Sequence, residues 1–171
     1  MNNTLKFEWV ELCCGIDNSE RSEYAGIFLR QSDIVGFISI APHVFNGIDF
    51  CRVEMVREAP HSKELYLVQK GVKATPPELS IYSMEILNCK SIPCACNKAY
   101  ELQLPISIES YKSDRFILGK IARVDASGIA LNWIAVNGET GTNTDLILYE
   151  EIDRISINGG YESFIVNALK S

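Results

Sequence analysis

Three cysteines lie close together in the middle of the chain, at Cys89, Cys94 and Cys96. Thiolates bind zinc and act as nucleophiles or redox groups, so this cluster is the sharpest candidate for chemistry. Zinc sites commonly use cysteine pairs separated by two to four residues, and the spacings here do not supply two such pairs. Cys13 and Cys14 are adjacent, and adjacent strand residues point to opposite faces, so they would not chelate one ion together. The sequence therefore predicts no metal site and no cofactor, and a connector of free thiols around Pro93.

A catalytic thiol needs a neighbouring base, and the available histidines are His43 and His61. Each follows a proline in a predicted turn or polar connector, so we expect both to face solvent. Carboxylates gather later in the chain, between Asp145 and Asp153, and paired carboxylates can perform acid–base catalysis. A solvated strand face explains the same residues. The sequence thus predicts no catalytic residue and no enzyme, and a thiol- or metal-dependent enzyme is kept as an alternative.

A binding function suits these carboxylates better, because aromatic residues flank them. Trp133 and Tyr149 would anchor a partner, while Glu150, Glu151 and Asp153 would attract a positively charged surface. We expect these five residues to form a patch that binds another protein. One concrete version is an immunity-like inhibitor that neutralises a basic toxin. An exposed strand edge is the other surface on which such a partner could dock.

Composition sets the limits of these hypotheses. The chain has 171 residues, 47% of them hydrophobic and 22% charged, and a formal net charge of −6 at pH 7. These values exclude collagen-like, coiled-coil and disordered chains. The negative charge argues against nucleic acid as a partner, since phosphate contacts need a basic surface. No apolar run reaches the ~18 residues of a membrane span, and the N-terminus does not resemble a signal peptide. We therefore expect a cytoplasmic protein that binds no membrane, and the oligomeric state stays open.

Strand patterns dominate the chain. Segments rich in Ile, Val and Phe alternate with turn residues such as Asn46-Gly47 and Asn137-Gly138. We expect strands over 5–10, 25–30, 34–40, 48–56, 64–69, 79–87, 101–109, 116–124, 128–136, 145–149 and 152–157. After Gly159-Gly160, helical spacing on one face predicts a short C-terminal helix, with Tyr161, Phe164, Ile165, Ala168 and Leu169 on that face. Residues 18–24 fit either a second helix or a loop.

Short strings recur in the same order in the two halves. The first half has Ile34-Val-Gly-Phe-Ile, Gly47-Ile-Asp-Phe and Leu79–Ile86, and the second has Ile117-Leu-Gly-Lys-Ile, Gly128-Ile-Ala-Leu and Leu146–Ile152. If they mark a repeat, each copy is a small five-stranded unit, and glycines 36 and 119 would let its strands bend. We expect two units, residues 1–97 and 98–171. Whether the first is a full copy of the second stays open.

The second half resembles the Sm-like and Src-homology-3-like small β-barrels. Residues 117–131 look like the first Sm motif, in which a bent strand with glycine leads through an Asp turn to a second apolar strand. The resemblance implies that residues 149–152 form a one-turn bridge before the final strand. The chain also resembles a broad group of uncharacterised bacterial proteins that end in a glycine loop, an acidic-Ile-x-x-Ile strand and a Tyr-led helix. Here those elements are 138–141, 151–155 and 161–169.

These resemblances imply a mainly β fold, made of tandem small Sm-like or SH3-like barrels, or strongly bent sheets, with a short C-terminal helix. The Sm resemblance also implies RNA binding in a ring. Glu150 and Glu151 stand where the bacterial RNA-binding branch carries basic residues, and negative charge there repels phosphate. We therefore expect a non-enzymatic protein-binding module of bacterial type, with Sm-like RNA binding as an alternative.

Overall fold

The computed structural model describes residues 6–14, 20–30, 34–41, 44–52, 56–58, 81–110, 113, 115–135, 137–143 and 145–169. The first part contains strands β1 (Lys6–Cys14), β2 (Glu20–Arg30), β3 (Ile34–Ala41), β4 (Val44–Arg52) and β5 (Val56–Glu58). Helices α2 (Ile81–Leu87) and α3 (Ile92–Glu101) follow. The second part contains β6 (Pro105–Ser110), β7 (Arg115–Val124), β8 (Gly128–Ile134), β9 (Thr140–Thr142), β10 (Ile147–Leu148), the 3-10 turn η3 (Tyr149–Glu151), β11 (Arg154–Ile157) and α4 (Gly160–Ala168).

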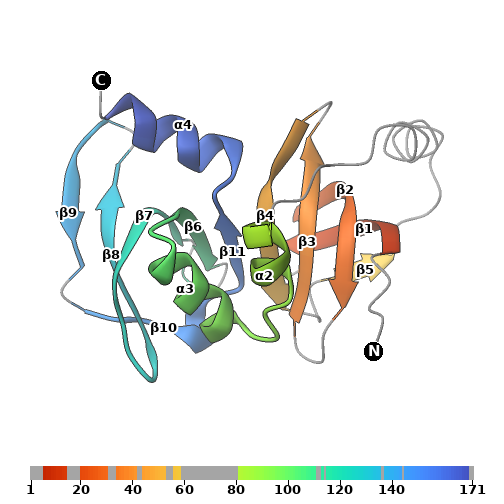
Figure 1. Cartoon of the computed structure of the whole chain (residues 1–171), viewed down its shortest axis with the longest axis horizontal. Helices are drawn as coiled ribbons and strands as arrows, with labels where there is room; N and C mark the ends of the chain where they lie inside the picture. The colour runs from red at the N-terminus through yellow and green to blue at the C-terminus, as the bar shows by residue number, and fades with distance from the viewer. Residues whose placement is uncertain are drawn as a thin grey trace.

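The strands form one antiparallel sheet, whose order is β10-β8-β7-β6-β11-β4-β3-β2-β1-β5, with β9 also paired to β8 (Figure 1). Strand β11 joins the two parts, because Ser156 lies opposite Asp49 of β4 on one side and opposite Ser107 of β6 on the other. The path is open, with β10 at one end and β5 at the other. The expected mainly β fold with a short C-terminal helix is therefore confirmed.

The two parts of the sheet share one strand order. If the strands of each part are numbered along the chain, with β9 and β10 counted together as the fourth strand of the second part, both parts have the same order across the sheet. That order is fourth, third, second, first, fifth. The recurring strings found in the sequence do not follow this order. Gly36 lies in the third strand of the first part, whereas its match Gly119 lies in the second strand of the second part. The string matches therefore pair strands that are not equivalent.

The core lies on one face of the sheet, which α3 covers in the second part (Figure 1). Alternation along the strands puts Ile106 and Ile108 of β6, and Ile155 and Ile157 of β11, into this core. Helix α3 buries residues Ile92, Ala95, Cys96 and Ala99 against them. Ser91 caps its first turn by accepting a hydrogen bond from the Cys94 amide at 3.3 Å, as N-cap serines commonly do.

Two expected elements are wrong. Residues 81–87, expected within a strand, form helix α2, which buries Ile86 and Leu87 in the core. The expected connector around Pro93 is helix α3, since proline is accepted in the first turn of a helix. Residues 18–24 were expected to form a helix or a loop, but β2 begins at Glu20 and includes residues 20–24. Residues 64–69, which were expected to form a strand, lie outside the described residues, and so do His43 and His61.

The one-turn bridge before the last strand is present as η3. The expected boundary at residue 97 falls inside α3, and the division into two domains stays a prediction. No helix in the described part of the chain is long and apolar enough to cross a membrane.

Candidate binding site

A polar network joins the two parts of the sheet on the face opposite the core. Asp49 Oδ1 accepts hydrogen bonds from Arg154 Nη2 at 2.9 Å and Nε at 3.3 Å, and also from Ser156 Oγ. Arg154 Nη1 reaches Glu109 Oε1 at 3.4 Å. The side chains of Asp49 and Arg154 are 2% and 11% exposed, so this ion pair is largely removed from water. The network ties β4, β11 and β6 together, which is a structural role.

Helix α4 is held to the same face by a buried carboxylate. Ser107 Oγ donates a hydrogen bond to Glu162 Oε1 at 2.6 Å, and the first turn of a helix also favours this negative charge. Glu162 and Val166, one turn apart, are the buried residues of α4. The apolar face expected from the sequence therefore points largely outward, and the exposed fractions of Tyr161, Phe164 and Leu169 are 42%, 69% and 45%.

Strands β7 and β8 separate at one end of the sheet. Their register runs from Val124, opposite Ile129, to Gly119, opposite Trp133. Beyond this point residues 115–118 of β7 pair only with β6 among the described strands. Over these four residues, no strand among the described residues pairs with the other backbone edge of β7. The other edge of β8 pairs with β9, where Trp133 lies opposite Gly141 and Ile134 lies opposite Thr140.

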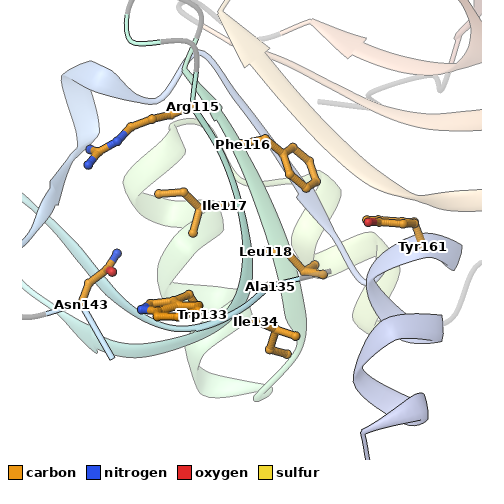
Figure 2. Close-up of a pocket in the computed structure, with 9 residues that line it drawn as sticks. All are labelled: Arg115, Phe116, Ile117, Leu118, Trp133, Ile134, Ala135, Asn143 and Tyr161. Atoms are coloured by element: carbon orange, nitrogen blue, oxygen red, sulfur yellow. The ribbon is translucent and has the colours of Figure 1, made fainter. Parts of the chain in front are cut away.

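A pocket of about 440 Å³ lies where the two strands diverge, and we call it the aromatic groove (Figure 2). Its lining comes from residues 115–118 of β7, from residues 133–135 at the end of β8, and from Asn143 and Tyr161. Phe116 and Tyr161 contact each other, with ring centroids 6.3 Å apart and planes tilted by 55°. Phe116 is 52% exposed, so β7 and α4 together present aromatic surface to solvent.

Trp133 forms another wall of this groove, on the strand opposite β7 (Figure 2). Its ring lies directly over Gly141 of β9, where an added Cβ would come within 2.6 Å of a ring atom. The absence of a side chain at Gly141 thus lets the indole lie flat against the strand. Arg115 is the charged residue among those that line the groove.

A second, smaller pocket of about 210 Å³ lies beside the first turn of α3. Its lining consists of Ile34, Arg52, Ser91, Ile92, Pro93, Tyr149 and Glu150. Arg52 organises one side of it by donating hydrogen bonds to the Tyr149 carbonyl at 3.0 Å and to the Ile152 carbonyl at 3.1 Å. We call this the α3 pocket.

The five residues of the expected acidic and aromatic patch are divided between these places. Trp133 lines the aromatic groove, whereas Tyr149 and Glu150 line the α3 pocket. Glu151 accepts a hydrogen bond from the Leu148 amide at 3.2 Å within η3. Asp153 is 9% exposed and lies 3.7 Å from Arg52. That these five residues bind a partner stays a prediction. Of the five, Trp133 alone lines the aromatic groove, together with Phe116 and Tyr161.

The cysteine cluster is brought together around the start of α3. Cys89 and Cys96 are buried, Cys94 is half-buried, and each is a free thiol. Within the described residues, no group of three or more His, Cys, Asp or Glu side chains could hold a metal ion. Burial, then a hydrogen bond to Cys94, raises the pKa of Cys89 well above its usual value.

Raising the pH above about 9 is expected to weaken the fold through Cys96. Burial raises the pKa of its thiol from 9.0 to about 12. Because the folded-state pKa is the higher one, the stability it contributes is complete below pH 9.0 and is lost as the pH rises toward about 12. In urea unfolding with reductant present, the free energy of unfolding should fall with pH more steeply for the native chain than for Cys96→Ala. The difference should approach ~1.4 kcal/mol per pH unit. Equal slopes would contradict this assignment.

Sequence reasoning missed Arg115, Phe116 and Tyr161 as site residues. Phe116 fell within an expected strand and Tyr161 on the expected apolar face of a helix, so neither was singled out as a site residue. Their exposure depends on where β7 and β8 part and on which face of α4 is buried. Nothing in the local pattern reveals either. Comparison of this chain with known proteins gives no further guide to the site, because no protein-family model, curated protein or solved structure matches it.

Proposed function

We propose that this chain is a non-enzymatic protein-binding module and that the aromatic groove is its binding surface. The observation that carries the proposal is the pair of exposed aromatic side chains that contact each other in the groove lining, Phe116 and Tyr161. Large apolar side chains exposed next to one another mark interaction surfaces, whereas scattered ones need no explanation. Aromatic residues are also the commonest anchors of such surfaces.

The free edge of β7 favours an extended segment as the partner. Residues 115–118 have hydrogen-bonding backbone groups on both edges, and β6 pairs with only one of them. An extended peptide that adds to the other edge would supply the missing hydrogen bonds, and alternate side chains would enter the groove. The pocket beside this edge would accept a large apolar side chain next to the contacting rings of Phe116 and Tyr161.

Charge defines the partner further. Arg115 supplies the charge in the groove lining, so a bound segment gains from an Asp or Glu next to its apolar anchor. The chain as a whole carries −6, which steers a basic partner toward other parts of its surface. A partner that is basic overall, as an immunity-like inhibitor would require, therefore needs an acidic residue in the docking segment.

The finer architecture, two small Sm-like units in tandem, belongs to the same proposal. It is supported by the strand order that both parts of the sheet share and by η3 between β10 and β11. Sm-like RNA binding would use the same exposed rings to stack bases. We favour a peptide because a free strand edge matches a peptide backbone and offers nothing comparable to a nucleotide.

Substituting both Phe116 and Tyr161 with alanine is expected to weaken peptide binding at least about tenfold, since removing a central aromatic anchor commonly costs 1–2 kcal/mol or more. A displayed library of random 12-residue peptides is selected on the native chain and depleted on the double variant. The enriched peptides are then measured by fluorescence anisotropy. They should share a large apolar residue with a neighbouring acidic one.

Tyr100→Ala is the matched control, since Tyr100 is 39% exposed and lines neither pocket. It should leave the affinity unchanged. N-methylation of alternate backbone amides in the best peptide should abolish binding if the peptide adds as a strand. Peptides that bind the double variant as well as the native chain would overturn the assignment of the groove. Binding of oligouridylate, lost on Phe116→Ala, with no peptide enriched, would overturn it in favour of RNA.

A further inference from the structure

The β7 edge that borders the aromatic groove is closed at one end and open at the other. At the closed end Gly119 lies opposite Trp133, and from there to Val124 the strand β8 occupies this edge. At the open end lies Arg115, the first residue of β7. Strand residues advance by about 3.3 Å each, so residues 115–118 offer an edge about 10–13 Å long. A segment that adds to this edge therefore pairs over about four residues.

The closed end leaves no room for a chain to pass. The backbones of β7 and β8 approach each other so closely at Gly119 that a Cβ added there would lie 2.9 Å from Trp133 Cα. A segment running along the β7 edge would meet the paired strands at this point and would have to bend out of the sheet. A segment whose own chain begins or ends here needs no such bend. The shape of the groove therefore favours a chain terminus as its occupant.

The direction of pairing decides which terminus lies at the closed end. Strands β6 and β8 both pair antiparallel with β7, and antiparallel pairing is slightly more stable per residue than parallel pairing. A segment antiparallel to β7 starts beside Trp133 and runs toward Arg115. Its N-terminus, and not its C-terminus, would therefore lie at the closed end.

The charges in the groove agree with this direction. Figure 2 shows Arg115 and Trp133 at opposite ends of the groove, so the guanidinium group lies away from the closed end. A C-terminal carboxylate placed beside Trp133 would have no cation near it among the described lining residues. An α-ammonium group in the same place is attracted to the indole ring, because tryptophan is the best partner for a cation among the aromatic side chains.

We propose that the aromatic groove binds the free N-terminus of a partner chain, with the α-ammonium group at Trp133 and an acidic fourth residue opposite Arg115. This inference rests on the proposed peptide binding and adds which end of the partner is bound and in which direction. In an antiparallel pair, residues directly opposite each other share a face of the sheet. The third residue would lie opposite Phe116, on the side of β7 where Tyr161 lies, and should be large and apolar (Figure 2). The acidic residue therefore follows the apolar anchor directly.

The test compares two random peptide libraries on the full chain, one displayed with a free N-terminus and one fused by its N-terminus to a carrier. The first should be enriched, with a large apolar third residue and an Asp or Glu as the fourth. The best peptide is then measured by fluorescence anisotropy with its label at the C-terminal end. Acetylation of its N-terminus should weaken binding at least about fivefold, because the cation is lost. A Gly-Ser pair added before the first residue should weaken it further, whereas the same pair added after the last residue, the matched control, should leave the affinity unchanged.

Arg115→Gln tests the direction of the bound segment. Replacing the acidic fourth residue of the peptide with its amide should weaken binding to the native chain and make no difference to this variant. An acidic residue that precedes the apolar anchor, or equal affinity of the free and acetylated peptides, would overturn the inference. If peptides from the carrier library bind as tightly and lose binding on the Phe116 and Tyr161 double variant, the terminus is not what is recognised, while the proposed peptide binding stands. Enrichment from neither library would overturn both.

Discussion

Replacing Arg154 with alanine is expected to lower the free energy of unfolding by about 3–5 kcal/mol, the largest effect of a single side-chain truncation anticipated in this molecule. Asp49 would lose its cationic partner in a site where the side chain is 2% exposed. Its Oδ2 atom has no hydrogen-bond partner within the described residues, so Arg154 and Ser156 supply the partners of this carboxylate. A buried carboxylate deprived of its cation is far more costly than an exposed one.

Arg123→Ala is the matched control for this prediction. Arg123 Nε lies 2.9 Å from Asp125 Oδ2, the same separation as in the buried pair, but the two side chains are 58% and 42% exposed. Exposed pairs contribute about 0–1 kcal/mol, so this variant should unfold at nearly the native denaturant concentration. Guanidinium unfolding followed by circular dichroism measures both. Similar, small losses for the two arginines would contradict the role assigned to the polar network.

Gly119→Ala is expected to destabilise the fold by about 3 kcal/mol or more. A Cβ at this position would lie 2.1 Å from the Asn132 carbonyl oxygen and 2.9 Å from Trp133 Cα, both in the backbone of β8. Backbone atoms cannot yield as the end of a flexible side chain can, so the β7–β8 pairing has to shift. Since Gly119 lies opposite Trp133 in the last pair before the strands diverge, this shift would also widen the aromatic groove.

Gly138→Ala separates this clash from the general cost of replacing glycine. Gly138 has a positive φ of 87°, but the nearest atom to an added Cβ is Leu169 Cδ2 at 3.9 Å. It should cost about 1–2 kcal/mol, the penalty of the left-handed region alone. Thermal and urea unfolding give the comparison. If Gly119→Ala proved no more destabilising than Gly138→Ala, the close approach of β7 and β8 would not be a requirement of the fold.

Strands with a simple alternation could be predicted from the sequence. The strand expected over 116–124 is β7 (Arg115–Val124), and that expected over 152–157 contains β11 (Arg154–Ile157). Strand β11 alternates polar and apolar residues, β7 is rich in Ile, Leu and Val, and a turn that contains Gly or Asn follows each of them, which are the signals that predict strands. The helix after Gly159 was also anticipated, though not which of its faces is buried.

The two short helices could not be predicted, for reasons of size. Helix α2 has seven residues, too few for a helical period to stand out from a strand-like run of apolar residues. Helix α3 buries Ala95, Cys96 and Ala99 at helical spacing, but small side chains and a nearby proline resemble a connector. Tertiary contacts with the sheet decide both, and local propensity is a weak guide in such cases.

The candidate site was beyond sequence reasoning because it depends on register. Arg154 and Asp49 are 105 positions apart and meet only because β11 inserts beside β4. In the same way, the aromatic groove exists because β7 runs on past the end of its pairing with β8. Trp133 was singled out together with the acidic turn, yet its neighbours in space are Gly141 and the β7 strand rather than the turn at Glu150.

The central position of β11 governs the order in which the chain can reach its final form. This strand follows every other strand along the chain, yet it lies between β4 and β6. During synthesis, β4 and β6 must therefore emerge with one edge unpaired. For β4, about a hundred further residues are made before β11 can pair with that edge. Closure over so long a separation is slow. The nascent protein consequently passes through a period in which two open β margins are available to other chains, so a chaperone that shields extended backbone would benefit it most at that moment.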